Sequence, residues 1–182
     1  RCVYNNGSGG FFIQMRNTAF GIGVAGSTEN NAFSYTFTSG TWYHIAVSRS
    51  GTTVYGFVNG TLISSGSNSV NYAQGGAWIG ALYDGTSQTV FGYISNLRLT
   101  KGQALYTSNF TPSTLPLLPI PGTQVLGART YKLAGDSSPN NLVVSVTGTP
   151  SMQKFSPFNS YPITKNYSMT FPTTGSNFSG SN

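Results

Sequence analysis

The dipeptide Asn59-Gly60 stands between two runs of β-branched and aromatic residues, 53–58 and 61–65. A two-residue β-hairpin of type I′ needs a positive φ at both central positions, and asparagine and glycine tolerate that conformation best. A further run of this kind, residues 41–49, comes just before the hairpin. We therefore predict an antiparallel β-meander of three strands in this part of the chain.

The first of these runs, residues 41–49, is apolar on both of its alternating faces. One face would carry Trp42, His44 and Ala46, and the other Tyr43, Ile45 and Val47. A strand with one face in water would instead alternate apolar and polar residues. The pattern predicts a strand in the middle of a sheet, covered on both sides.

The rest of the first hundred residues also predicts strands. No window longer than two helical turns shows the 3.6-residue apolar spacing without glycine or proline. Short apolar runs, at 11–16, 19–24, 32–37, 78–80 and 91–100, are separated by turn residues such as Asn17-Thr18 and 84–87. Short strands with glycine-rich turns and no helices predict an all-β protein built as a two-sheet β-sandwich or jelly roll.

The composition changes after residue 109. Residues 110–121 contain four prolines and several leucines, and such a segment cannot continue a central strand. We predict an extended strap docked against the sandwich. Further strands are predicted beyond it, at 123–126, 131–133, 142–147 and 167–171. The predicted organisation is a sandwich over 1–112, a proline-rich connector over 113–122, a smaller β unit over 123–158, and the possible start of a repeat over 159–182.

Charge and cysteine usage exclude some classes of function. Only 7% of the 182 residues are charged, against about 25% in ordinary soluble domains. The net charge of +6 arises because acidic residues are few, and the cationic residues are spread along the chain. Nucleic-acid binding needs clustered cations, so it is not expected here. Cys2 has no partner for an internal disulfide. No apolar run is long enough for a membrane helix, and the start at Arg1 shows no signal peptide, so we expect a piece of a longer extracellular protein.

Several motifs together resemble a known family. They are Trp42 to Arg49, Val58-Asn59-Gly60, Ile79-Gly80 and Gly92 to Arg98. In order and spacing they are similar to the laminin-G-like, concanavalin-A-type jelly rolls related to pentraxins. The continuation through Phe110-Thr-Pro, Asp136 to Gly148 and Phe155-Ser-Pro-Phe158 resembles laminin-G-like repeats of bacteriophage virion and tail-fibre proteins.

The resemblance implies a role and a context. Such domains recur in tandem, so residues 1–112 would be one copy without its first strands, and residues 167–171 resemble the opening strand of the next copy. It implies a virion-surface or extracellular location. The implied partners are host-surface glycans and other virion or fibre subunits, in a homo-oligomer or tandem repeat, with no nucleic acid and no membrane insertion.

Candidate glycan contacts lie in the loops around Trp78. Sugars stack their C–H faces on aromatic rings while their hydroxyls bond polar side chains. Suitable residues are Tyr72, Gln74, Tyr83, Asp84 and Gln88. The alternative reading is that these aromatic rings complete the core or an interface.

Three further side chains have both a structural and a functional reading. Asp84 lies in a loop where similar domains bind calcium or glycans. Calcium prefers several carboxylates, whereas Asp84 stands alone. Calcium is therefore the one cofactor that we consider for this protein, and the sequence requires none. Asp136 begins a turn that it can cap. His44, the single histidine, is expected to be a core residue with a hydrogen-bonded ring nitrogen.

The sequence predicts no enzyme. Glycoside hydrolysis on such sandwiches needs two carboxylates that flank one bond, and the chain's acids, Glu29, Asp84 and Asp136, form no motif. The predicted function is therefore a structural and adhesive surface protein that binds host glycans. Two alternatives stay open: an assembly module that binds no sugar and uses the apolar strap as an interface, and a bacterial surface adhesin.

Overall fold

The computed structural model describes residues 1–25, 29–73, 75–129, 133 and 135–158, and two further backbone strands at 168–171 and 177–181. Strands, turns and extended segments make up this part of the chain, with no helix, so the predicted all-β class is confirmed. The strands are β1 (Cys2–Asn5), β2 (Phe11–Arg16), β3 (Ala19–Val24), β4 (Glu29–Ser34), β5 (Ile45–Ser50), β6 (Thr53–Val58), β7 (Thr61–Ser67), β8 (Ala77–Ile79), β9 (Gly92–Ile94), β10 (Leu97–Thr100), β11 (Thr123–Gly127), β12 (Val143–Thr147), β13 (Ser151–Gln153), β14 (Ser168–Phe171) and β15 (Asn177–Ser181).

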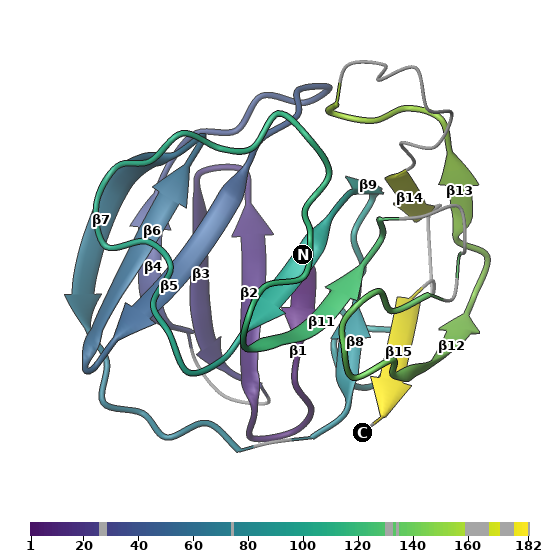
Figure 1. The fold of residues 1–182 in the computed structure, drawn as a ribbon, viewed down its shortest axis with the longest axis horizontal. Helices are drawn as coiled ribbons and strands as arrows, with labels where there is room; N and C mark the ends of the chain where they lie inside the picture. Colours follow the sequence, from purple (N-terminus) through teal and green to yellow (C-terminus); the bar gives the residue numbers. More distant parts are fainter. Residues whose placement is uncertain are drawn as a thin grey trace.

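A seven-stranded sheet forms one layer of the molecule (Figure 1). Its strand order is β12-β15-β8-β1-β2-β3-β4. The three-stranded sheet β5-β6-β7 packs over β3 and β4, where Phe20, Phe33 and Val54 are almost fully buried. The β10-β11 pair packs over β1 and β8, with Leu97 and Leu99 against Tyr4. These two smaller sheets therefore cover different parts of the same inward face, and a third small sheet has the order β13-β14-β9.

The predicted hairpins are confirmed. Arg16 pairs with Ala19 across Asn17-Thr18, and Val58 pairs with Thr61 across Asn59-Gly60. Asn59 and Gly60 have φ angles of 50° and 81°, as a type I′ turn requires. The Asn59 side chain also accepts a hydrogen bond from the His44 backbone N–H, at 2.9 Å, so this turn is tied to the start of β5.

The proline-rich segment and the residues before it cover the outer face of β5 and β6. Phe57 is fully buried there, against the rings of Tyr106 and Phe110. These two rings stack with centroids 3.6 Å apart. The strap then continues to β10, where the Leu117 N–H donates to Asn96 Oδ1 at 2.9 Å. The docked strap predicted from the sequence is what the structure contains.

The strands after the strap differ from the expected smaller unit over 123–158. β11 pairs directly with β10, in the register Leu97↔Gly127. β12 joins β8 through β15, and β13 joins β9 through β14. Only β11 thus bonds directly to a strand of the first hundred residues, whereas β12 and β13 are linked to β8 and β9 through β15 and β14.

Three strand predictions need correction. The strand expected over 41–49 begins only at Ile45, and it lies at the edge of its sheet rather than in the middle. The strand expected over 91–100 is broken at Asn96, whose φ is 56°. The strand expected over 32–37 is β4, which starts and ends earlier. The strand expected over 131–133 lies largely outside the described residues.

Cys2 is enclosed on the outward face of the seven-stranded sheet. Its side chain is fully buried and packs with Phe12, Ala25 and Leu82. The thiol donates to the Tyr4 carbonyl at 3.3 Å. Burial raises the pKa of the thiol to about 12, so Cys2 is a protonated packing residue.

Candidate functional site

Three of the predicted glycan contacts lie in the turn between β8 and β9. Tyr83, Asp84 and Gln88 are all exposed there, Tyr83 by 38%. Asp84 Oδ1 accepts the backbone N–H groups of Thr86 and Ser87 at 3.0 and 2.8 Å. The carboxylate therefore shapes this turn.

Tyr72 belongs to a different environment. Its ring meets Phe11 edge-on, with centroids 5.9 Å apart. Its hydroxyl accepts a hydrogen bond from Asn68 Nδ2 at 2.8 Å, and the Arg49 guanidinium lies 5.9 Å from the ring centroid. Tyr72 thus packs at the edge of the core. Gln74, the fifth predicted contact, lies outside the described residues.

Two neighbouring residues of β2 show how these groups are separated. Successive side chains of a strand point to opposite faces of the sheet. Phe11 packs with Tyr72 on the inward face, whereas Phe12 packs with Leu82, next to Tyr83, on the outward face. The structure therefore brings Tyr83, Asp84 and Gln88 together and places Tyr72 on the other side of the sheet. Glycan binding by any of them stays a prediction.

Calcium binding at Asp84 stays a prediction, and no second carboxylate supports it among the described residues. Calcium takes six to eight oxygen ligands, usually with more than one carboxylate. In the described part of the chain no three His, Cys, Asp or Glu side chains gather in a possible metal site. Burial acts to raise the pKa of Asp84, but hydrogen bonds from Ser87 and Thr86 outweigh it and hold the pKa below its usual value. These bonds explain the residue as a turn cap.

A cluster of aromatic rings was missed at the sequence level. Trp42 lies 6.1 Å from Tyr93 and 5.4 Å from Phe155, between ring centroids, and Tyr93 lies 5.0 Å from Phe155. Tyr93 is 46% exposed and Phe155 52%. We call these three residues the aromatic cluster. The sequence pattern placed Trp42 on one face of a buried strand, and its two partners come from distant parts of the chain, so no local signal indicated the cluster.

The aromatic cluster borders a large open cleft. The cleft has a volume of about 2170 Å³, and its lining includes all three rings of the cluster. It extends along β5 on one side and β10 on the other, with β1 and β2 beneath. In Figure 1, β2 is visible between β5 and β11. The cleft is therefore the opening between the two smaller sheets.

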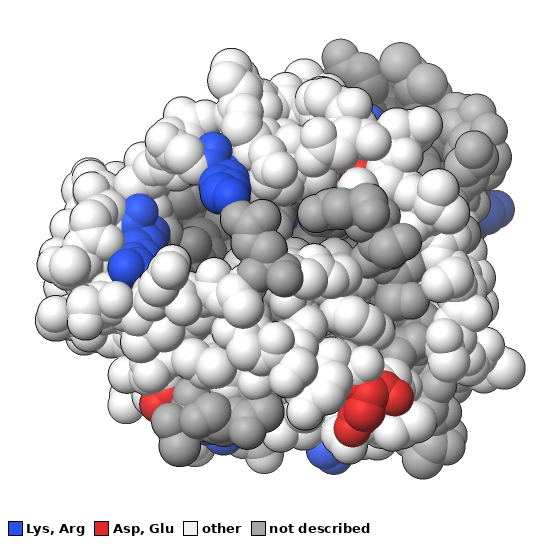
Figure 2. All heavy atoms as spheres, turned by 90° about the horizontal axis from the view of Figure 1, so that it is seen from below, with Lys and Arg blue, Asp and Glu red and all other residues white. Residues whose placement is uncertain are grey.

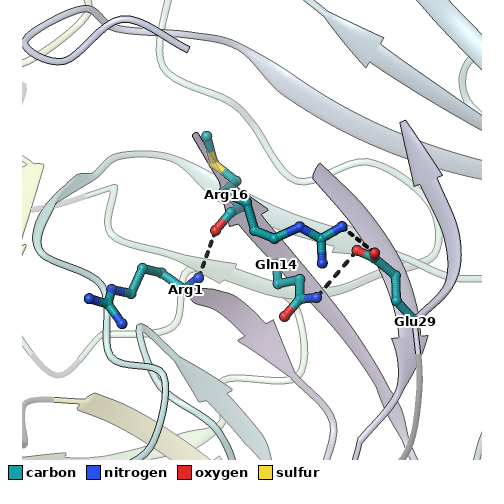
Figure 3. Close-up of polar contacts among 5 residues, drawn as sticks. Arg1, Gln14, Arg16 and Glu29 are labelled. Atoms are coloured by element: carbon teal, nitrogen blue, oxygen red, sulfur yellow. Dashed lines mark hydrogen bonds and ion pairs between the residues drawn. The ribbon is translucent and has the colours of Figure 1, made fainter. Parts of the chain in front are cut away.

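The three acids of the chain are each engaged in local structure. Glu29 pairs with Arg16 and accepts a hydrogen bond from Gln14, at 3.3 Å, on the outward face of the sheet (Figure 3). Asp84 caps its turn, as described above. Asp136 accepts the backbone N–H groups of Leu126, Ser138 and Leu142, which confirms its predicted turn-capping role.

His44 packs at the point where β5 meets the strap. Its ring meets Phe110 edge-on at 5.5 Å. Its Nδ1 atom is buried, and among the described residues it has no hydrogen-bond partner, so only the other ring nitrogen could fulfil the expected hydrogen bond. Burial and the positive charge of Arg98 lower the pKa of His44. The residue is a neutral packing group.

The surface charge is sparse. Figure 2 shows one face of the molecule, on which a few separate blue and red groups stand in a largely uncharged surface. The described residues on that face form no continuous basic patch of the kind that a phosphate backbone would need. No helix in the described ranges is long and apolar enough to cross a membrane.

Comparison with known proteins identifies the first part of the chain. A family model described as the concanavalin A-like lectin/glucanases superfamily matches residues 1–105. Neither the curated proteins nor the solved structures gave a significant match. The matched region runs from β1 through β10 and includes Trp42 and Tyr93 of the aromatic cluster.

Proposed function

This chain belongs to the concanavalin A-like lectin/glucanases superfamily, and on that premise we propose that it is a non-catalytic surface protein that binds host-surface glycans. The observation that carries the proposal is the aromatic cluster. Tyr93 and Phe155 are about half exposed beside Trp42, on the border of an open cleft. Apolar groups that lie together on a surface mark interaction sites, and the C–H faces of sugars suit aromatic rings.

The state of the acids supports binding without catalysis. Hydrolysis of a glycosidic bond needs a carboxylic acid and a second carboxylate on either side of that bond. Here Glu29 is paired with Arg16, while Asp84 and Asp136 cap turns. None of the three lines the cleft that the aromatic cluster borders. The chain therefore lacks a pair of acids placed at the site that we propose for the glycan.

The proposed setting is a virion fibre or a similar appendage. A shallow site with few hydrogen-bonding groups binds weakly, and weak sites gain from repetition along tandem copies or an oligomer. The sparse surface charge suits a particle that has to avoid unspecific adhesion. In this setting each copy contributes one weak glycan contact to multivalent attachment.

The experiment is a glycan array with the 182-residue protein, followed by binding measurements with the best glycan. Tyr93→Ala and Phe155→Ala should each weaken binding by about tenfold, because each removes a stacking ring. Val143→Ala is the control, since Val143 is 80% exposed and does not line the cleft. Tyr83→Ala tests the turn around Asp84 separately. Unchanged binding by both cluster variants would show that the site is elsewhere.

A second candidate function is an assembly module without glycan binding. Leu115 and Leu118 of the strap are 50% and 63% exposed, and paired exposed leucines are typical of contact surfaces. Replacing both with Asp should lower self-association, measured by light scattering, if the strap is an interface. An array without any bound glycan, together with self-association that depends on these leucines, would favour this function over the first.

A further inference from the structure

Tyr55 lies in β6 and faces the outside of the three-stranded sheet β5-β6-β7. Its two neighbours along the strand face the core, since Val54 is fully buried there and a Cβ on Gly56 would collide with the Phe33 ring. Successive side chains of a strand point to opposite faces of the sheet, so Tyr55 points outward. It belongs to none of the hydrophobic clusters that the described residues form. Packing of the core therefore does not explain this aromatic ring.

Hydroxyl side chains surround Tyr55 on this outward face. Residues that pair across neighbouring strands share a face, and the strands lie about 4.8 Å apart. The pairing register places two rows side by side across the three strands: Ser48, Tyr55 and Ser65 in one row, and Ser50, Thr53 and Ser67 in the next. Every side chain of the two rows carries a hydroxyl group, and Tyr55 stands at the centre of the first row.

The strap covers only one end of the outward face. Ser48 is buried there, and its Oγ accepts the Tyr106 backbone N–H at 3.4 Å. Phe57, the next outward residue of β6, is fully buried against the rings of the strap. The other residues of the two rows are exposed or half-buried: Ser50, Thr53, Tyr55, Ser65 and Ser67. We call these five residues the hydroxyl platform.

The ring at the centre of the hydroxyl platform has a fixed neighbour. Tyr55 and Phe57 lie with their rings 24° from parallel and their centroids 6.4 Å apart. Phe57 is in turn fixed by Tyr106 and Phe110, whose ring centroids lie 6.1 and 5.4 Å from its own. A ligand that stacks on an already positioned ring loses less free energy to side-chain ordering. The strap thus prepares Tyr55 for stacking without covering it.

The three strands direct no charge to the hydroxyl platform. Arg49 is the one charged residue of β5, β6 and β7. Its guanidinium donates to the Val70 carbonyl at 2.6 Å and lies 5.9 Å from the Tyr72 ring centroid, on the inward side of the sheet. A ligand on the platform would therefore find an aromatic ring and hydroxyl groups but no ionic partner. This combination suits an uncharged ligand rich in hydroxyl groups.

A protein partner fits this surface less well than a sugar does. The cores of protein interfaces are depleted of serine, whereas four of the five platform residues are serine or threonine. A sugar ring can stack its C–H face on an aromatic side chain. Its hydroxyl groups can at the same time donate to and accept from serine and threonine hydroxyls. The chemistry of the platform thus favours a glycan.

We propose that the hydroxyl platform is a second binding site of this protein, where a neutral polysaccharide stacks on Tyr55 and exchanges hydrogen bonds with Thr53 and Ser65. These three residues do not line the cleft that the aromatic cluster borders, so the proposal does not depend on glycan binding at that cluster. Two sites on separate surfaces would let one chain hold two polysaccharide strands, or one strand at two points, and so gain avidity.

The test is affinity electrophoresis of the 182-residue protein in native gels that contain hydroxyethyl cellulose, dextran or galactomannan. At least one of these neutral polysaccharides should retard the protein. The dissociation constant should be the same at about 50 mM and 500 mM salt, because no charge takes part in the contact. If none of the three polysaccharides retards the protein, or if salt weakens the binding, the proposal is wrong.

A matched pair of variants assigns the binding to the hydroxyl platform. Tyr55→Ala should weaken binding by about tenfold, because the stacking ring is lost. Tyr55→Phe keeps the ring and should lose no more than about threefold. Equal weakening by both variants would show that the ring does not stack. Lower self-association of Tyr55→Ala in light scattering, with unchanged retardation, would make the platform a protein interface and overturn the proposal.

A second pair separates this site from the aromatic cluster. In a Tyr93→Ala background, where the cluster lacks one ring, Tyr55→Ala should still weaken the remaining binding by about tenfold. If Tyr93→Ala alone abolishes retardation and Tyr55→Ala alone changes nothing, the aromatic cluster is the glycan site and the hydroxyl platform is not. If only Tyr55→Ala has an effect, the platform is the site and the role proposed for the cluster is wrong.

Discussion

Ile22 and Ile13 stand opposite each other in the β2–β3 pair, on the same face of one sheet, but they experience different surroundings. Both residues line part of the cleft, but Ile22 is only 7% exposed beneath β5-β6-β7, whereas Ile13 is half-buried. We call the first region the covered half and the second the open half of the sandwich. The difference shows that the inward face of the large sheet is apolar beyond the area that the two smaller sheets cover.

The first prediction compares these two isoleucines directly. Ile22→Ala should lower the free energy of unfolding by about 3 kcal/mol, because it leaves a cavity in a packed core. Ile13→Ala should cost about 1 kcal/mol, since water already reaches that side chain. Urea denaturation of both variants measures the difference. Equal losses would mean that the open half is as well covered as the other.

The second prediction extends the comparison to the two hairpin turns of the smaller sheet. Gly60 has a φ of 81°, and a Cβ there would collide with the Phe110 carbonyl oxygen of the strap. Gly51 has a φ of 58° and no neighbour within 4 Å of such a Cβ. Gly60→Ala should therefore cost about 2 to 3 kcal/mol, against about 1 kcal/mol for Gly51→Ala, which adds backbone strain alone. Thermal unfolding of the pair would reveal whether the strap holds its position against Gly60.

The third prediction concerns pH at the junction between β5 and the strap. The pKa of His44 in the folded protein is lowered from its ordinary value of 6.5. As the pH falls, His44 therefore binds a proton at a higher pH in the unfolded chain than in the folded protein. Stability should be complete above pH 6.5 and decline as the pH falls below it, until the folded-state pKa is passed. His44→Gln should remove this part of the pH dependence. If the free energy of unfolding of the variant declined with falling pH as steeply as that of the original protein, another group would be responsible for the pH dependence.

The smallest effect is expected on the outward face, at the ion pair of Figure 3. Arg16 is 45% exposed and Glu29 13%, so water screens the pair. Glu29→Gln should change the free energy of unfolding by about 0.5 kcal/mol or less, and this difference should shrink in 1 M salt. Denaturation at two salt concentrations checks both statements. A loss above about 1.5 kcal/mol would give Glu29 a larger role than a surface ion pair.

Local signals explain which parts of the fold could be predicted from the sequence. Asn59-Gly60 and Asn17-Thr18 encode their hairpins within a few residues, and Asp136 caps a turn through its own neighbours. The edge position of β5 depends instead on which strand pairs with it, and pairing is not a local property. β1 (Cys2–Asn5) was not expected because four residues give too short a pattern.

The candidate site shows the same limit. Tyr72 and Tyr83 are close in sequence, yet Tyr72 packs on Phe11 on one face of the sheet, whereas Leu82, next to Tyr83, packs on Phe12 on the other face. The aromatic cluster joins residues 42, 93 and 155, which only the folded chain brings together. Residue type predicted which side chains could contact a sugar, while their assembly depended on strand order.

Cys2 gives the molecule a single chemical reporter. Because the thiol is buried and its pKa is about 12, it cannot form the reactive thiolate in the folded state at neutral pH. An alkylating reagent would modify it only during moments when β1 separates from Phe12 and Leu82. The rate of labelling would therefore time the opening of the first strand in the unmodified protein.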